Sequence, residues 1–168
     1  MTIIPHFSAI SAGLSTILKP GSPDPAARNL ANLYISLWDF DEKWYVSNNP
    51  DLASAIPSEN FPTGWRHFRA IGYFEGRLPA APHVDAPWYM STYPDVASAI
   101  IEGTFADAAE HFLTLGYREG RLSSDPRVEP AWYAPRYMPH NGAADAKACT
   151  NHFLRYGYLN GAVPARPR

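Results

Sequence analysis

The chain has 168 residues, of which 18% are charged and 14% aromatic, and its formal net charge is −2. A chain of this length buries about 70% of the surface that its unfolded form exposes, and so high an aromatic content argues against disorder. Because its basic residues are scattered rather than clustered, we do not expect nucleic acid as a partner.

The first 39 residues predict two amphipathic helices that precede the repeated part of the chain. Apolar residues recur on one face of 7–18 and of 24–40, and a turn rich in Pro and Gly separates them. The first stripe contains Phe7, Ile10, Leu14, Ile17 and Leu18, and the second contains Leu30, Leu33, Tyr34, Leu37 and Trp38. We expect 1–39 to act as a cap or an interaction segment, with the first stripe as the candidate contact for self-association.

The N-terminus does not have the pattern of a secretory leader. No Lys or Arg precedes its apolar part, and Pro5 interrupts that part. No run of about 18 apolar residues occurs, so the sequence predicts no membrane span. We therefore expect a cytoplasmic location. The single cysteine, Cys149, is compatible with it and is expected to be a buried filler.

From residue 40 onward the sequence repeats with a period of about 44 residues. Each copy begins with a Trp-Tyr pair and ends in an octapeptide, GYFEGRLP, GYREGRLS or GYLNGAVP. We assign repeat 1 to 40–83, repeat 2 to 84–127 and a degenerate repeat 3, the C-terminal cap, to 128–168. Because one helical unit is not expected to bury its apolar face alone, the sequence predicts a single all-α domain of stacked repeats, solenoid-like or a compact helical array.

Each repeat is expected to begin with a short helix. A carboxylate three residues before the Trp favours the helix start, as at Asp41, Asp85 and Glu129. Pro50 and Pro94 are expected to end this helix and to begin a second one.

The second half of each repeat has a helical period as well. A small residue, the His, the Phe and the residue three positions after the Phe share one predicted face. That last position holds Ile71, Leu115 or Tyr156. The second glycine of the octapeptide is expected to end the helix in a left-handed conformation. The apolar residue two positions after this glycine is expected to pack back against the helix. These glycines are Gly76, Gly120 and Gly161, and the apolar residues are Leu78, Leu122 and Val163.

The pattern WY…YPDVA…HF…G…EGR resembles a short helical repeat found in tandem in bacterial proteins. These include some polysaccharide-making glycosyltransferases and haemolysin-type secreted calcium-binding proteins. The resemblance covers 40–164 and is weakest in repeat 3, where EGR becomes NGA. In such proteins the repeat looks like an accessory module, and this chain has neither a glycosyltransferase-sized domain nor the GGxGxD calcium motif. The resemblance therefore implies a fold more than a function.

Three repeated histidines, His67, His111 and His152, raise the question of catalysis or metal binding. Asp51 or Asp95 could orient such a histidine as a general base, or share a metal ion with it. We favour a structural interpretation, in which a buried histidine bonds a neighbouring carboxylate or carbonyl, because an enzyme seldom needs two copies of one dyad. No GxSxG, Walker or HExxH pattern occurs, so the sequence predicts no catalytic residue, cofactor or metal.

The tryptophans that begin the repeats, Trp44, Trp88 and Trp132, allow two interpretations. Rings at regular spacing suit a platform for polysaccharide, but large aromatic residues at helical positions are more often core or packing between repeats. We favour packing. Trp65 occurs in repeat 1 alone, and it is expected at the periphery as a candidate interaction residue.

Arg77 and Arg121 directly follow the helix-ending glycine and are the other candidate interaction residues. They could bind a phosphate or a sugar acid, but phosphate sites favour helix N-termini and these are C-termini. We favour an ion pair with Glu75 or Glu119, or with the next repeat.

Repetition without a recognised catalytic motif favours a non-catalytic protein–protein interaction or scaffold protein. The resemblance adds a bacterial envelope or exopolysaccharide pathway as the expected context. The alternative is a carbohydrate-binding module that uses the repeated Trp and Tyr, followed by an enzyme or metal protein that uses the repeated His and Asp. The expected partners are an unidentified protein, a second copy of the chain, or a polysaccharide.

Overall fold

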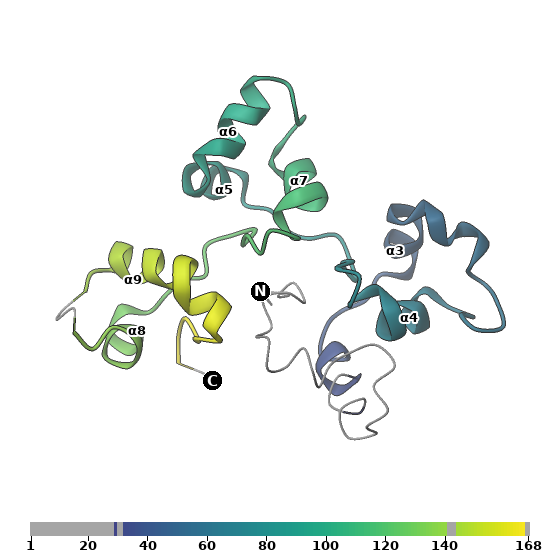
Figure 1. Ribbon diagram of the computed structural model, residues 1–168, viewed down its shortest axis with the longest axis horizontal. Helices are drawn as coiled ribbons and strands as arrows, with labels where there is room; N and C mark the ends of the chain where they lie inside the picture. Colours follow the sequence, from purple (N-terminus) through teal and green to yellow (C-terminus); the bar gives the residue numbers. More distant parts are fainter. Residues whose placement is uncertain (1–28, 30–31, 141–143, 167–168) are drawn as a thin grey trace. The chain divides into compact units, whose positions relative to one another are not determined.

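The computed structural model describes residues 29, 32–140 and 144–166, and these residues form helices and loops without a strand (Figure 1). The expected all-α fold class is thereby confirmed. The chain divides into two compact units, of which the first ends at His83 and the second begins at Val84. Unit 1 therefore contains repeat 1, and unit 2 contains repeats 2 and 3. Within the described residues, no helix is long and apolar enough to cross a bilayer.

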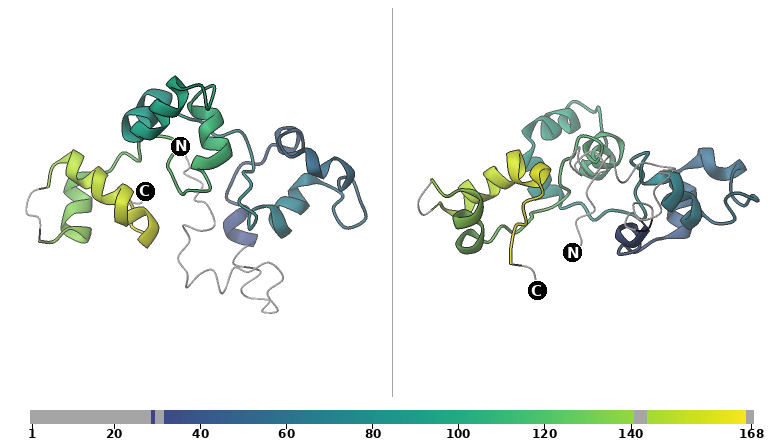
Figure 2. Two further views of the ribbon diagram at one scale, coloured as in Figure 1. Left: turned by 45° about the horizontal axis from the view of Figure 1, so that its top comes forward. Right: turned by 60° about the horizontal axis from the view of Figure 1, so that its bottom comes forward.

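All three repeats share one order of elements, in which a Trp-containing helix is followed by a His-containing helix and a π-helical turn. Repeat 1 contains α3 (Glu42–Asn48), a 3-10 helix (Pro50–Ser54), α4 (Gly64–His67) and a π turn (Phe68–Gly72). Repeat 2 contains α5 (Ala86–Thr92), α6 (Pro94–Ile101), α7 (Ala108–His111) and a π turn (Phe112–Gly116). Repeat 3 contains α8 (Pro130–Tyr137), α9 (Ala146–His152), a π turn (Phe153–Gly157) and a 3-10 helix (Tyr158–Asn160). The Trp-containing and His-containing helices of each repeat contact each other (Figure 2).

The expected starts and ends of the Trp-containing helices are confirmed in repeats 1 and 2. Asp41 and Asp85 each accept a hydrogen bond from the N–H of the Trp three residues later, at 3.0 and 3.1 Å. Glu129 stands at the same position before α8, but its side chain makes no capping bond. Pro50 and Pro94 begin the next helix, as predicted.

Each repeat has an apolar core of its own, built around the tyrosine of the Trp-Tyr pair. These tyrosines are 0% exposed, and each ring meets edge-on the phenylalanine that follows the histidine. The centroid distances are 5.6 Å for Tyr45–Phe68, 5.9 Å for Tyr89–Phe112 and 6.0 Å for Tyr133–Phe153. Cys149 is fully buried, as expected of a filler.

A backbone hydrogen bond joins the two ends of each repeat. The N–H of the residue at the helix start donates to a carbonyl just after the octapeptide's apolar residue. The pairs are Asp41 with Pro79 at 3.0 Å, Asp85 with Ser123 at 2.9 Å and Glu129 with Pro164 at 2.9 Å. Each repeat thus closes on itself around its own core, and the stacked arrangement of repeats stays a prediction.

The apolar face predicted for 24–40 is confirmed at Tyr34 and Trp38, which pack against Tyr73, and it is wrong at Leu33 and Leu37. Leu33 and Leu37 are 67% and 77% exposed, whereas Ile35 and Trp38 are buried. The helix ends at residue 35, and Trp38 N–H bonds the carbonyl of Ile35 three residues earlier. Because this turn is tighter than an α-helix, it directs Trp38 rather than Leu37 toward repeat 1. Leu30 and the whole first stripe, from Phe7 to Leu18, lie outside the described residues.

The predicted inner face of the second half is wrong at its last position. Leu115 and Tyr156 are 44% and 58% exposed, and Ile71 is half-buried. The reason is the π turn, in which Tyr117 N–H bonds the carbonyl of Phe112 five residues earlier, at 2.9 Å. The wider turn places Tyr117, rather than Leu115, over the phenylalanine.

The octapeptide ends the helical segment as predicted. Its second glycine has a positive φ in every repeat, 76° at Gly76, 73° at Gly120 and 72° at Gly161. Leu78 and Leu122 pack back and are buried, but Val163 is 40% exposed, in keeping with the degenerate octapeptide of repeat 3.

Candidate functional site

In each repeat the histidine is hydrogen-bonded to the buried tyrosine. The distance from the tyrosine hydroxyl to Nδ1 of the histidine is 2.9 Å for Tyr45–His67, 3.0 Å for Tyr89–His111 and 2.9 Å for Tyr133–His152. His67 and His111 are 6% and 4% exposed, and His152 is half-buried. The bonding partner is therefore a hydroxyl, in place of the carboxylate or carbonyl expected from the sequence.

In repeats 1 and 2 burial disfavours the charged forms of both members of this pair. It lowers the pKa of His67 and His111 below the usual 6.5, and the nearby guanidinium of Arg77 or Arg121 lowers it further. Burial also raises the pKa of the tyrosines, that of Tyr133 to about 12. In repeats 1 and 2 the bond between imidazole and phenol joins two helices, and burial makes the imidazole a weaker base than a free one.

The first glycine of the octapeptide makes room for this bond. A β-carbon at that glycine would collide with the hydroxyl of the buried tyrosine in all three repeats. The colliding pairs are Gly72 with Tyr45, Gly116 with Tyr89 and Gly157 with Tyr133. Sequence reasoning assigned a role to the second glycine alone, although the recurrence of both glycines was a signal for the first one as well.

Arg121 is held by two carboxylates of its own repeat. Its Nη1 and Nη2 donate to the two oxygens of Asp95 at 3.0 and 2.7 Å, and its Nε donates to Glu119 at 2.6 Å. The guanidinium also lies over the ring of Tyr93, 5.0 Å from its centroid.

Arg77 repeats this arrangement in unit 1. It bonds Asp51 at 3.0 and 2.8 Å and Glu75 at 2.8 Å, and its Nη1 also donates to Asn49 at 2.8 Å. The ion pair with the glutamate is the one the sequence suggested. The aspartate partner lies in the same repeat rather than in the next one.

The aspartates are therefore bound to arginine and do not orient the histidines. Hydrogen bonds from Arg77 and Arg121 hold the pKa of Asp51 and Asp95 below the usual range for a carboxyl group. Across the part of the chain that the structure describes, no group of three or more His, Cys, Asp and Glu side chains is placed to hold a metal ion.

The tryptophans of the Trp-Tyr pairs lie at the margin of each core. Trp44, Trp88 and Trp132 are all half-buried, while the tyrosines beside them are fully buried. Trp88 lies 6.2 Å from the ring of Tyr93, and the guanidinium of Arg136 covers Trp132 at 4.5 Å.

Trp65 packs between two phenylalanines of unit 1. Its ring lies 5.1 Å from that of Phe40 and 6.2 Å from that of Phe68, and Arg69 covers it at 5.5 Å. The ring is half-buried, so part of it remains accessible to solvent.

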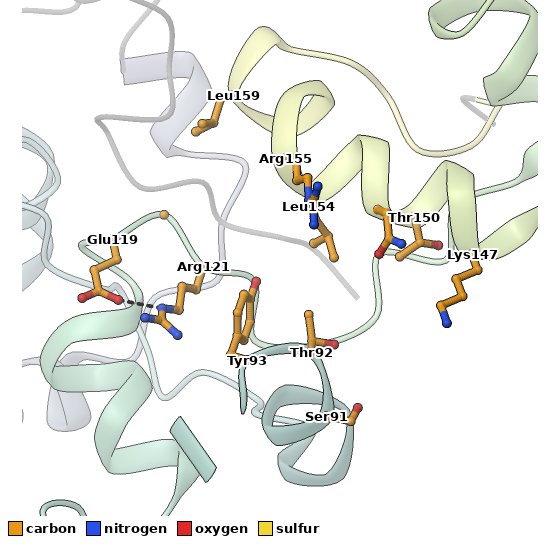
Figure 3. A pocket seen from close by; sticks show the side chains of 12 residues that line it. Ser91, Thr92, Tyr93, Glu119, Arg121, Lys147, Thr150, Leu154, Arg155 and Leu159 are labelled. Carbon is orange, nitrogen blue, oxygen red and sulfur yellow. Dashed lines mark hydrogen bonds and ion pairs between the residues drawn. The ribbon is translucent and has the colours of Figure 1, made fainter. Parts of the chain in front are cut away.

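Unit 2 contains a cleft of about 510 Å³ that sequence reasoning missed (Figure 3). One wall comes from the end of α5 and from the octapeptide of repeat 2, and the other comes from α9 and the turns that follow it. The lining residues are Ser91, Thr92, Tyr93, Glu119, Gly120, Arg121, Lys147, Thr150, Asn151, Leu154, Arg155 and Leu159. The helical spacing of 147, 150, 151, 154 and 155 was the available signal, but these residues are of mixed polarity and form no apolar or charged stripe.

No protein-family model, no curated protein and no solved structure matches this chain.

Proposed function

We propose that the chain is a non-catalytic protein–protein interaction or scaffold protein. One observation carries the proposal. The polar side chains that recur in the repeats form hydrogen bonds and ion pairs within their own repeat, while large apolar side chains face solvent. In unit 2 these apolar residues include Ile101, 87% exposed, and Leu159, 48% exposed.

These hydrogen bonds and ion pairs occupy the repeated histidines and arginines, which are the side chains that catalysis or anion binding would use. Both the histidines and the arginines contact side chains of their own repeat. Large apolar side chains that face solvent are, by contrast, available for contact with a protein partner. The resemblance of the repeat to modules of bacterial proteins supports an envelope or exopolysaccharide pathway as the setting.

Affinity purification of the tagged full-length chain from its native host tests this proposal. We expect a protein partner to co-elute in a fixed ratio, and to bind again when both purified proteins are mixed. A chain that retains its fold but recovers no protein partner would contradict the proposal. The tag alone serves as the control for nonspecific capture.

Carbohydrate binding is a second candidate, favoured by the half-exposed indole rings that begin each repeat. Trp88→Ala, with Trp65→Ala as the control outside the repeated row, would separate the two functions on a glycan array. Glycan binding by the wild type that is lost in Trp88→Ala, with the fold intact, would replace the protein-binding proposal. Absence of glycan binding in the wild type would remove this candidate.

A further inference from the structure

The cleft of unit 2 has two walls of different electrostatic character. On the repeat 2 wall, the single positive charge of Arg121 is paired with two carboxylates, those of Asp95 and Glu119, so this cluster offers no positive charge to a ligand. On the repeat 3 wall, Lys147 and Arg155 are exposed, and neither forms an ion pair within the described residues. The positive charge that is available to a ligand therefore lies on the repeat 3 wall.

Apolar side chains line the same cleft as these two cations. Leu154 and Leu159 also line the cleft, the first half-buried and the second 48% exposed. Figure 3 shows Leu154 and Arg155 on the repeat 3 wall, opposite Tyr93 and Arg121. A ligand that fits this wall needs a negative charge and an apolar group close to each other.

The chemistry of the cleft favours a peptide over a saccharide. Sugar rings stack on open aromatic faces, but Tyr93, the one aromatic ring among the described residues that line the cleft, has the Arg121 guanidinium over it at 5.0 Å. Its hydroxyl already accepts the N–H of Leu122 at 3.1 Å. Leu154 lies next to Arg155 in Figure 3, and an apolar side chain beside a carboxylate matches such a neighbourhood.

We propose that this cleft binds an acidic peptide segment of a partner protein, with Lys147 and Arg155 contacting its carboxylates and Leu154 and Leu159 contacting an apolar side chain between them. The inference rests on the proposed function and names the surface and the chemistry of the partner. The volume of about 510 Å³ lies in the range of sites that hold a few side chains of a ligand.

The test uses a charge-reversed full-length chain, Lys147→Glu/Arg155→Glu. The matched control is Lys43→Glu/Arg118→Glu, which changes the net charge equally at exposed positions that do not line the cleft. Both variants are first compared with the wild type by thermal unfolding, because a change at an exposed position is expected to leave the fold intact.

A displayed library of random peptides is selected against the wild type, and the enriched peptides are synthesised and titrated by fluorescence anisotropy. We expect sequences in which Asp or Glu flanks an apolar residue. Their affinity should fall by about tenfold or more in Lys147→Glu/Arg155→Glu and by less than about twofold in the control. Leu159→Ser should weaken the same peptides without changing their preference for acidic residues.

In the peptide experiment, the proposal is overturned by no enriched peptide, by enriched peptides without acidic residues, or by equal loss of binding in both charge-reversed variants. Alginate oligosaccharides, titrated in parallel, would show a saccharide site if they alone bind the wild type and lose affinity in Lys147→Glu/Arg155→Glu. A protein partner purified with the wild-type chain separates failure of the cleft as the binding site from failure of the proposed function. Equal binding of that partner to Lys147→Glu/Arg155→Glu refutes the site and leaves the function standing.

Discussion

At the scale of single residues, the tyrosine hydroxyl is the atom on which each repeat is centred. The hydroxyl forms a hydrogen bond with the histidine and lies against a glycine that has no β-carbon. The tyrosine, the histidine and the glycine therefore depend on one another. A tyrosine hydroxyl that is buried with a hydrogen-bond partner contributes about 1 kcal/mol to stability.

Gly116→Ala is expected to destabilise unit 2 by about 2–3 kcal/mol, because the new methyl group collides with the hydroxyl of Tyr89. Tyr89→Phe alone should cost about 1 kcal/mol through loss of the bond to His111. In the double variant the hydroxyl is absent, so Tyr89→Phe should become neutral or stabilising. Urea unfolding of all four proteins measures this coupling, and simple addition of the two losses would disprove the steric explanation.

The buried histidines predict a dependence of stability on pH. The folded pKa of His67 and His111 is lowered, so the unfolded chain takes up protons first as the pH falls. Stability is therefore fully present above the unfolded pKa of about 6.5 and is lost as the pH falls through the lowered folded pKa.

His67→Gln/His111→Gln is expected to reduce this pH dependence even though it lowers stability overall. The measurement is the free energy of unfolding in urea at about pH 7.5 and about pH 5.5, a range above the window in which carboxyl groups titrate. If the wild type and the double variant lost equal stability between these pH values, the two histidines would not be its source.

At the scale of elements, Arg121 ties the octapeptide that follows the π turn to the start of α6. It joins Asp95, in the first turn of α6, to Glu119 in the octapeptide. The side chain of Arg121 is 19% exposed, but those of Asp95 and Glu119 are 62% and 43% exposed, so solvent screens much of the attraction.

Arg121→Ala is expected to cost about 1 kcal/mol, and Arg121→Lys should recover less than half, because an ammonium group cannot contact both oxygens of Asp95 and Glu119 at once. Ala162→Arg is the matched control. It places an arginine at the equivalent position of repeat 3, where Pro139 replaces the aspartate, and should add no stability. Equal unfolding free energies for wild type and Arg121→Ala would show that the ion pairs contribute nothing.

The elements also show where sequence rules act well. Side-chain caps begin the Trp-containing helices of repeats 1 and 2, and Thr63, Asp107 and Asp145 cap the His-containing helices. The π turns were not predictable in the same way, because an i+5 hydrogen bond leaves no distinct apolar period in so short a segment. Their position next to the glycine and tyrosine suggests that close packing stabilises the wider turn.

At the scale of the whole molecule, each repeat closes on itself, and the chain divides into two compact units at 83 and 84. A repeat that carries its own core and joins its own ends can open without its neighbours. Local opening of this kind is visible as faster amide exchange in one part of the chain.

Gly72→Ala in the full-length chain is expected to accelerate amide exchange in 41–78 by about tenfold or more. Its new methyl group would collide with the hydroxyl of Tyr45, in the core of repeat 1. Amides in 85–140 and 144–164 should exchange at rates within about twofold of the wild type. Hydrogen exchange measured by mass spectrometry tests this, and equal acceleration in both units would show that they unfold as one.

The sequence by itself determined the helical class, the proline and aspartate helix boundaries and the left-handed glycines. These features depend on backbone rules that act over a few neighbouring residues. Only the tertiary structure decided the bonding partners. His67 bonds Tyr45, 22 positions away in the sequence, and Arg77 bonds Asp51, 26 positions away. The sequence pattern allowed the aspartate as a partner of the histidine as well. The cleft that exposes Lys147 and Arg155 likewise depends on two repeats being close together, which no local preference can specify.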